Sequence, residues 1–145
     1  MLKFIEDKVD SLFVFSGDIV PKPRMTKADT WKKRPVVMKY WQFKDEISRQ
    51  AKDQDFILPD EFTIKVYIKM PQSWSKKKKE SLHMKPHKQR PDLDNILKAV
   101  QDCLSTEDCG VWELYASKQW VNSENSYIII EKLEKDMQEN LQIVN

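Results

Sequence analysis

The stretch that decides the fold is Arg90-Pro91-Asp92-Leu93-Asp94-Asn95-Ile96-Leu97-Lys98-Ala99-Val100-Gln101-Asp102-Cys103-Leu104. Its apolar residues recur at intervals that place them on one side of a helix: Leu93, Ile96, Leu97, Val100 and Leu104. This spacing predicts an amphipathic helix with one buried face. Pro91 and Asp92 supply a start signal, because Asp is a favoured N-cap and Pro is tolerated where a helix begins.

Polar side chains crowd onto the first two turns of this predicted helix. Asp92, Asp94 and Asn95 stand at its entrance, and Lys98 lies one turn after Asp94 on the same face. Mg²⁺ is held in proteins by a few carboxylates together with water and phosphate oxygens. Two carboxylates at a helix entrance, preceded by a basic loop, therefore indicate a divalent-metal site that faces a phosphate.

A third carboxylate for such a site would come from Glu107 or Asp108, which follow the helix. The residues also allow a purely structural interpretation. In that interpretation Asp92 is only an N-cap, and Asp94 forms an exposed ion pair with Lys98, which would contribute about 0.3–0.5 kcal/mol.

Length and composition predict one soluble domain. The chain has 145 residues, 40% of them hydrophobic and 33% charged. We interpret residues 1–145 as a single domain with its own core, in which 1–10 form a loosely held lead-in and 134–145 a terminal helix or tail. No apolar run approaches the length that crosses a membrane, so we expect no membrane partner.

Cellular location is predicted from the N-terminus and the cysteines. Glu6, Asp7 and Asp10 interrupt any signal-peptide pattern. Cys103 and Cys109 belong to no CxxC motif and have no histidine partner nearby, which favours reduced thiols in a cytoplasmic protein and argues against zinc.

Positive charge is concentrated in two segments, although the net charge is only +2. Residues 21–34 hold six basic side chains against Asp29 alone: Lys22, Arg24, Lys27, Lys32, Lys33 and Arg34. Residues 69–90 hold eight against Glu80 alone: Lys69, Lys76, Lys77, Lys78, Lys79, Lys85, Lys88 and Arg90. Charge segregated in this way predicts a basic face that binds a polyanion.

The rest of the chain alternates strand and helix patterns. Aromatic and β-branched residues, alternation and turn residues predict strands at 11–20, 61–70, 111–121 and 126–133, the last two as a hairpin through 122–125. Three- and four-residue spacing predicts a helix over 35–54, and Ser73 or Ser75 could cap a short helix over 76–84. The prediction is an α/β domain of order β-α-β-α-β-β, with a small mixed sheet packed against two main helices.

Several other side chains allow more than one role. Trp31 and Trp74 lie in basic segments and could stack on unpaired bases or anchor the core. We assign Trp41, Trp112 and Trp120 to the core or a dimer interface. A metal-binding role for His83 and His87 is disfavoured, because Pro86 interrupts the helical spacing they would need.

The segment from Pro91 to Leu104, followed by Glu107-Asp108-Cys109 and Val111-Trp112-Glu113-Leu114, resembles the RusA family of Holliday-junction resolvases, of phage or prophage type. The upstream stretches Lys22-Pro23-Arg24-Met25-Thr26 and Ser73-Trp74-Ser75-Lys76-Lys77-Lys78 are also similar to that family. The similarity covers roughly residues 11 to 130, and the D-x-D-N-x-x-K pattern is specific in this context.

The resemblance implies a homodimeric, Mg²⁺-dependent endonuclease that cuts four-way DNA junctions symmetrically, with Mn²⁺ as a substitute ion and no organic cofactor. It implies metal ligands at Asp92, Asp94 and Asp108, with Glu107 beside the last, and a functional lysine at Lys98. The two basic segments would then contact the DNA backbone: Lys22, Arg24, Lys27, Lys32, Lys33, Arg34, Lys76, Lys77, Lys78, Lys79, Lys88 and Arg90.

Two departures from the family pattern leave other functions open. Only Ser105 and Thr106 separate Leu104 from Glu107, which is fewer residues than the family usually has, and Gly110 replaces a frequent Gln. A short turn that withdraws Asp108 would leave a weakened or inactive junction-binding protein, unless Glu107 or Glu113 replaces it. A basic interaction module that docks on an acidic partner is the third possibility.

Overall fold

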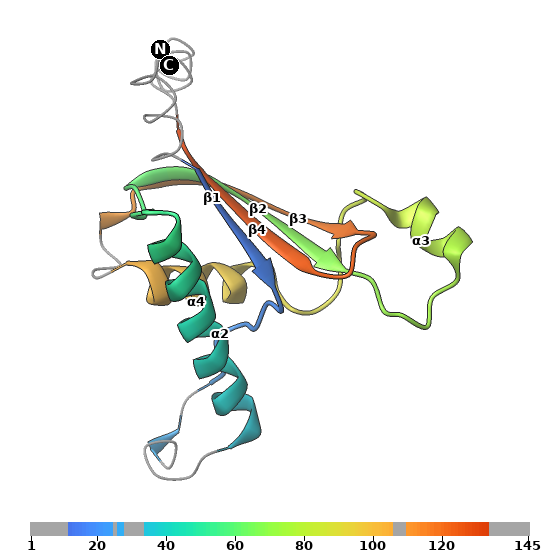
Figure 1. Ribbon diagram of the computed structural model, residues 1–145, viewed down its shortest axis with the longest axis horizontal. Helices are drawn as coiled ribbons and strands as arrows, with labels where there is room; N and C mark the ends of the chain where they lie inside the picture. Colours follow the sequence, from blue (N-terminus) through green and yellow to red (C-terminus); the bar gives the residue numbers. More distant parts are fainter. Residues whose placement is uncertain (1–11, 25, 28–33, 106–109, 134–145) are drawn as a thin grey trace.

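The structure is a computed structural model that describes residues 12–24, 26–27, 34–105 and 110–133. The elements are β1 (Leu12–Gly17), α2 (Pro35–Asp53), β2 (Glu61–Lys69), α3 (Lys76–Leu82), α4 (Leu93–Leu104), β3 (Glu113–Val121) and β4 (Ser126–Lys132). The four strands form one sheet of order β1-β4-β2-β3. Helices α2 and α4 lie on one side of this sheet, and α3 projects beyond its end (Figure 1). The predicted fold class and element order are confirmed, and the short helix predicted after β2 is present as α3.

The predicted hairpin between the last two strands is wrong. Strand β2 lies between β3 and β4, pairing parallel with β3 and antiparallel with β4. The turn at 122–125 therefore carries the chain across the end of β2, as the right-hand end of the sheet in Figure 1 shows. Because β2 and β3 are parallel, the chain must cross over between them, and α4 lies on this crossover connection.

Alternation along β2 builds the core. Phe62, Ile64 and Val66 are fully buried toward the helices, while Lys65 is exposed on the opposite face. The buried face of α4 packs against this layer through the positions that its spacing predicts, Ile96 and Val100 among them. Apolar burial of this kind supplies most of the stability of the domain.

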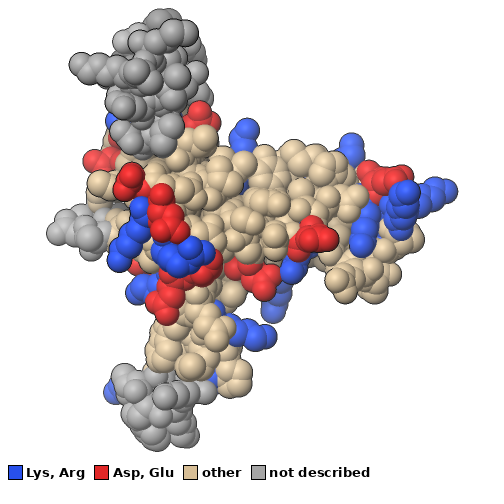
Figure 2. Space-filling view, in the orientation of Figure 1, with Lys and Arg blue, Asp and Glu red and all other residues tan. Residues whose placement is uncertain are grey.

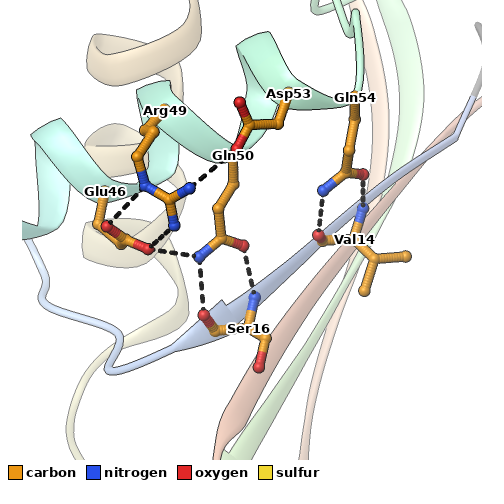
Figure 3. A network of polar contacts seen from close by, with 7 residues as sticks. All are labelled: Val14, Ser16, Glu46, Arg49, Gln50, Asp53 and Gln54. Atoms are coloured by element: carbon orange, nitrogen blue, oxygen red, sulfur yellow. Dashed lines mark hydrogen bonds and ion pairs between the residues drawn. The ribbon is translucent and has the colours of Figure 1, made fainter.

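The outer edge of β1 is covered by side chains of α2 (Figure 3). Gln50 accepts a hydrogen bond from the Ser16 amide at 3.0 Å and donates to the Ser16 carbonyl at 2.9 Å. Gln54, one turn later, makes the same two bonds to Val14 at 3.0 and 2.8 Å. The two glutamines thus bond the edge as a neighbouring strand would, and they satisfy backbone groups that otherwise invite pairing with another chain.

The tryptophans divide between core and surface. Trp120 is buried at 6% exposure, as predicted for a core residue, whereas Trp112 is 69% exposed and Trp41 is 39% exposed. A core role for Trp112 is therefore wrong, and its indole Nε1 donates instead to the Glu61 carboxylate. Trp31 lies outside the described residues. None of the helices described in this structure is both long and apolar enough to span a membrane.

Candidate active site

Asp92 and Asp94, the two aspartates at the entrance where α4 begins, are exposed, and neither belongs to an ion pair within the described part of the chain. Asp92 holds the N-cap position with extended backbone, but its side chain makes no capping hydrogen bond. Asp94 and Lys98 are both exposed, and within the described part of the chain they form no ion pair with each other. The N-cap position of Asp92 is therefore as expected, but neither the side-chain cap nor the Asp94–Lys98 ion pair is observed, and both aspartates are exposed.

A hollow of about 570 Å³ adjoins this entrance. Pro21, Arg90, Pro91, Asp92 and Asn95 line it. The start of the first basic segment and the end of the second therefore meet at the entrance, which lies between the 21–27 loop and α3 (Figure 1). An anionic ligand in this hollow would face Arg90 and, through a bound cation, the acidic pair.

Lys118 of β3 binds the backbone that leads into α4. Its Nζ donates to the backbone carbonyls of Gln89 and Pro91, both at 2.6 Å. Burial lowers the pKa of this ammonium, and the negative charge of Asp92 opposes that shift. No motif in the sequence pointed to Lys118, although its position in the strand pattern carries a signal. It occupies an inward position of β3 between Ala116 and Trp120, where alternation calls for an apolar residue.

The third predicted ligand cannot be placed, because Glu107 and Asp108 lie outside the described residues. Their described neighbours, Ser105 and Gly110, follow the last turn of α4. With 12 residues, that helix separates its two ends by about 18 Å. Among the residues that the structure describes, no three His, Cys, Asp or Glu side chains are grouped as metal ligands.

Glu113, the other alternative ligand, begins β3, five residues before Lys118. That spacing corresponds to about 16 Å along the strand. Within one chain, Glu113 therefore lies at the far end of β3 from the Asp92 entrance.

The first basic segment is partly engaged with the domain itself. Lys22 forms a 2.6 Å ion pair with Asp102 on α4. Arg34 donates to the carbonyl of Arg24 at 3.0 Å and so ties the two ends of the loop together. The side chains of Arg24 and Lys27 are exposed, while Lys32 and Lys33 lie outside the described residues.

The second basic segment forms a projecting arm. Ser75 accepts a hydrogen bond from the Lys78 amide and caps α3, as one of the two predicted alternatives. Lys76, Lys77 and Lys78 are exposed, and Lys79 is partly so. Figure 2 shows basic side chains gathered over this end of the molecule. Lys88 and Arg90, also exposed, continue the basic surface from the arm toward the α4 entrance.

Aromatic side chains attach the arm to the sheet. Trp74 packs on Trp120 with ring centroids 4.8 Å apart, and the Lys78 ammonium lies 4.0 Å above the Trp74 ring. On the other side of Trp120, the ring of His87 lies at 4.1 Å. Of the two roles considered for Trp74, the structure shows the anchoring one.

The two histidines are engaged in structural contacts. His83 Nδ1 accepts a hydrogen bond from the Asn122 amide at 2.9 Å. His87 is buried, and burial together with the nearby charge of Lys118 lowers its pKa.

Comparison with known protein families identifies the family of this chain. The family model described as Endodeoxyribonuclease RusA matches residues 17–131. The chain belongs to the RusA family. No curated protein matches it. The matched region contains every described strand except the first five residues of β1 and the last residue of β4, and it contains all three described helices. RusA membership makes the chain a relative of junction-resolving endonucleases, as the resemblance in the sequence predicted.

Proposed function

We propose that this RusA-family chain is a Mg²⁺-dependent endodeoxyribonuclease that resolves four-way DNA junctions in recombination and repair by paired, symmetrical hydrolysis of phosphodiester bonds. The observation that carries the proposal is the pair of exposed carboxylates at the start of α4, Asp92 and Asp94, of which Asp92 lines a hollow together with Arg90. In a family of DNA endonucleases, this arrangement supports the proposal because carboxylates that could hold a cation lie near an arginine that could bind phosphate.

The donor set at the entrance fits Mg²⁺. Carboxylate and amide oxygens are the ligands this hard cation prefers, and Asp92, Asp94 and Asn95 offer them on the first turn of α4. When bound, the ion supplies charge neutralisation at the phosphate, activation of water and stabilisation of the leaving oxygen. Mn²⁺ has similar ligand preferences and is expected to substitute for it. Asp108 remains the proposed third ligand, with Glu107 as its neighbour.

Side chains around the carboxylates would bind and orient the DNA. Lys98, exposed one turn after Asp94, is assigned to the scissile phosphate, whose charge its ammonium offsets. Arg90 can bind phosphate oxygens in a bidentate manner. The exposed lysines of the α3 arm would bind the backbone of a DNA arm farther from the site, a contact that is sequence-independent and salt-dependent.

Symmetrical cutting calls for two equivalent sites. A four-way junction has near two-fold symmetry, and a C₂ homodimer presents one site to each of two opposed strands. The proposed functional unit is therefore a homodimer, in which each protomer supplies one α4 entrance.

The experiment that tests the function uses purified protein and a synthetic mobile four-way junction. Paired nicks at symmetrical positions are expected with Mg²⁺ but not with EDTA, and linear duplex of the same sequence should remain intact. Cleavage of the duplex at the same rate would contradict junction selectivity.

A junction-binding protein with little or no cleavage is the second candidate, and the short turn between Leu104 and Glu107 favours it. In this case the junction is bound in preference to duplex in a gel-shift assay, but neither Mg²⁺ nor Mn²⁺ produces nicks. A basic interaction module would show no preference for the junction over duplex.

A further inference from the structure

The turn that leads into the acidic pair is fixed to β3 at several points. The amide of Met84 donates to the Trp120 carbonyl and the amide of Trp120 to the Lys85 carbonyl, both at 2.9 Å. The His87 amide donates to the Lys118 carbonyl at 3.0 Å. Residues 84–87 therefore lie along the edge of β3, and the backbone leaves that edge only after His87.

After His87, the backbone is bonded by the Lys118 side chain. Its ammonium binds the carbonyls of Gln89 and Pro91 at 2.6 Å each, and Pro91 directly precedes Asp92. Hydrogen bonds from a charged donor at this distance are stronger than neutral ones. Opposite Lys118 in the parallel pair is Val66, which is fully buried, so the Lys118 side chain extends from the buried part of the sheet.

The charge of Lys118 has no carboxylate within ion-pair distance among the described residues, which makes its place unusual. Burying an ammonium is costly unless it is well hydrogen-bonded. The two carbonyls provide those bonds, and the negative charge of Asp92 acts on the same group. A neutral side chain at this position would leave both carbonyls without this donor and would remove the positive charge behind Asp92.

We propose that Lys118 is a positioning residue for the metal site: it fixes the 89–91 turn so that Asp92 and Asp94 present their oxygens to the same cation. The inference rests on the proposed metal-dependent function. Lys118 itself touches neither metal nor DNA in this assignment. It acts through the backbone that carries the ligands, as residues that orient metal ligands do.

The test compares Lys118→Met and Lys118→Arg with a matched control, Lys65→Met. Lys65 lies on β2, one residue before the partner of Lys118, and is exposed on the opposite face of the sheet. Methionine keeps the length of the lysine side chain but removes its charge and hydrogen bonds. Arginine keeps the positive charge and the donors, and it provides a folded variant if the methionine protein does not fold.

The first readout is metal dependence. Lys118→Met should raise the Mg²⁺ concentration for half-maximal junction cleavage by about 10-fold or more, the range that outer-shell changes cost. Saturating metal should restore the rate, and junction affinity in EDTA should be unchanged. Lys118→Arg should recover part of the loss, and Lys65→Met should behave as the unsubstituted protein. Unchanged metal dependence in a folded Lys118→Met protein would overturn the inference.

The second readout does not depend on cleavage. Mn²⁺ affinity without DNA should fall in Lys118→Met, and amide hydrogen exchange should accelerate at residues 89–95, with neither change in the control. If the unsubstituted protein binds no metal, the metal site and the proposed function both fail. If it binds metal and Lys118→Met binds it equally well with unchanged exchange, only the role of Lys118 fails.

Discussion

Lys22, in the basic loop after β1, forms a 2.6 Å ion pair with Asp102 on α4, ten residues after Asp92. Asp102 also accepts a hydrogen bond from the Tyr40 hydroxyl at 3.4 Å. One carboxylate thus joins the loop, α2 and α4. A lysine predicted to bind DNA is held by the protein's own negative charge, and DNA would have to compete for it.

Replacing Asp102 should release this lysine. Because the two side chains are 40% and 24% exposed, the pair contributes only about 0.2–1 kcal/mol, and Asp102→Asn should lower stability by no more. Junction affinity at low salt should rise, since one negative charge is removed and Lys22 becomes available. Gel-shift titration in EDTA measures the effect, with Asp45→Asn on α2 as control. Equal gains in both variants would mean that only net charge matters.

The two glutamines that bond the edge of β1 predict that their alanine variants lose different amounts of stability. Gln50→Ala leaves the amide and carbonyl of the half-buried Ser16 without these partners, which should cost about 1–3 kcal/mol. Gln54→Ala faces the more exposed Val14 and should cost less. Urea unfolding measures both, and Gln42→Ala, exposed on the same helix, is the control.

Removing both glutamines should also open the edge of β1 to other chains. The double variant is therefore expected to associate with rising concentration under conditions where the parent does not. Sedimentation at several concentrations checks this. A double variant that shows no added association would indicate that the edge is protected by something other than these side chains.

Patterns local in the sequence predicted most of the fold, and contacts between distant segments did not follow from them. The α4 stripe and the alternation of β2 are set by which side chains need burial, so both are readable from spacing. Strand partners are not. The polar turn at 122–125 suits a hairpin, but β2, whose alternate residues are fully buried, takes the central place between β3 and β4 instead. The acidic pair was visible as a motif, whereas the carbonyls that Lys118 binds lie 27 and 29 residues away along the chain.

The acidic pair makes a direct prediction about activity. Asp94→Asn should reduce junction cleavage by more than the roughly 10–100-fold that outer-shell changes cost, because it removes a proposed metal ligand itself. Junction binding should persist or tighten, since the substitution takes away a negative charge near phosphate. Cleavage and gel-shift assays on the same preparation separate the two effects. Cleavage at the unsubstituted rate would show that the metal site has been assigned to the wrong residues.

His87 predicts how stability depends on pH. Burial and the charge of Lys118 lower its pKa below the ordinary value of 6.5, so the folded protein holds the ring neutral where the unfolded chain binds a proton. Its contribution is therefore fully present above about pH 6.5 and is lost as pH falls from there toward the folded pKa. Thermal unfolding between pH 8 and 5 should show a decline that becomes shallower in His87→Phe. His83→Phe, at an exposed position, is the control. An identical decline in the unsubstituted protein, His87→Phe and His83→Phe would contradict the assignment.

The α3 arm predicts the salt dependence of DNA binding. Replacing Lys76, Lys77 and Lys79 by glutamine should weaken junction binding and reduce the slope of log affinity against log salt by about 0.9 for each phosphate that is no longer neutralised. Lys78 is left in place because its ammonium packs over Trp74 and supports the arm. The matched control replaces three lysines that are exposed on α2, which lowers the net charge by the same amount: Lys39, Lys44 and Lys52. If α3 contacts DNA, its variant changes the slope more than the control does. Equal slopes would mean that the lysines act only through the overall charge of the protein, and the DNA path would then have to avoid the arm.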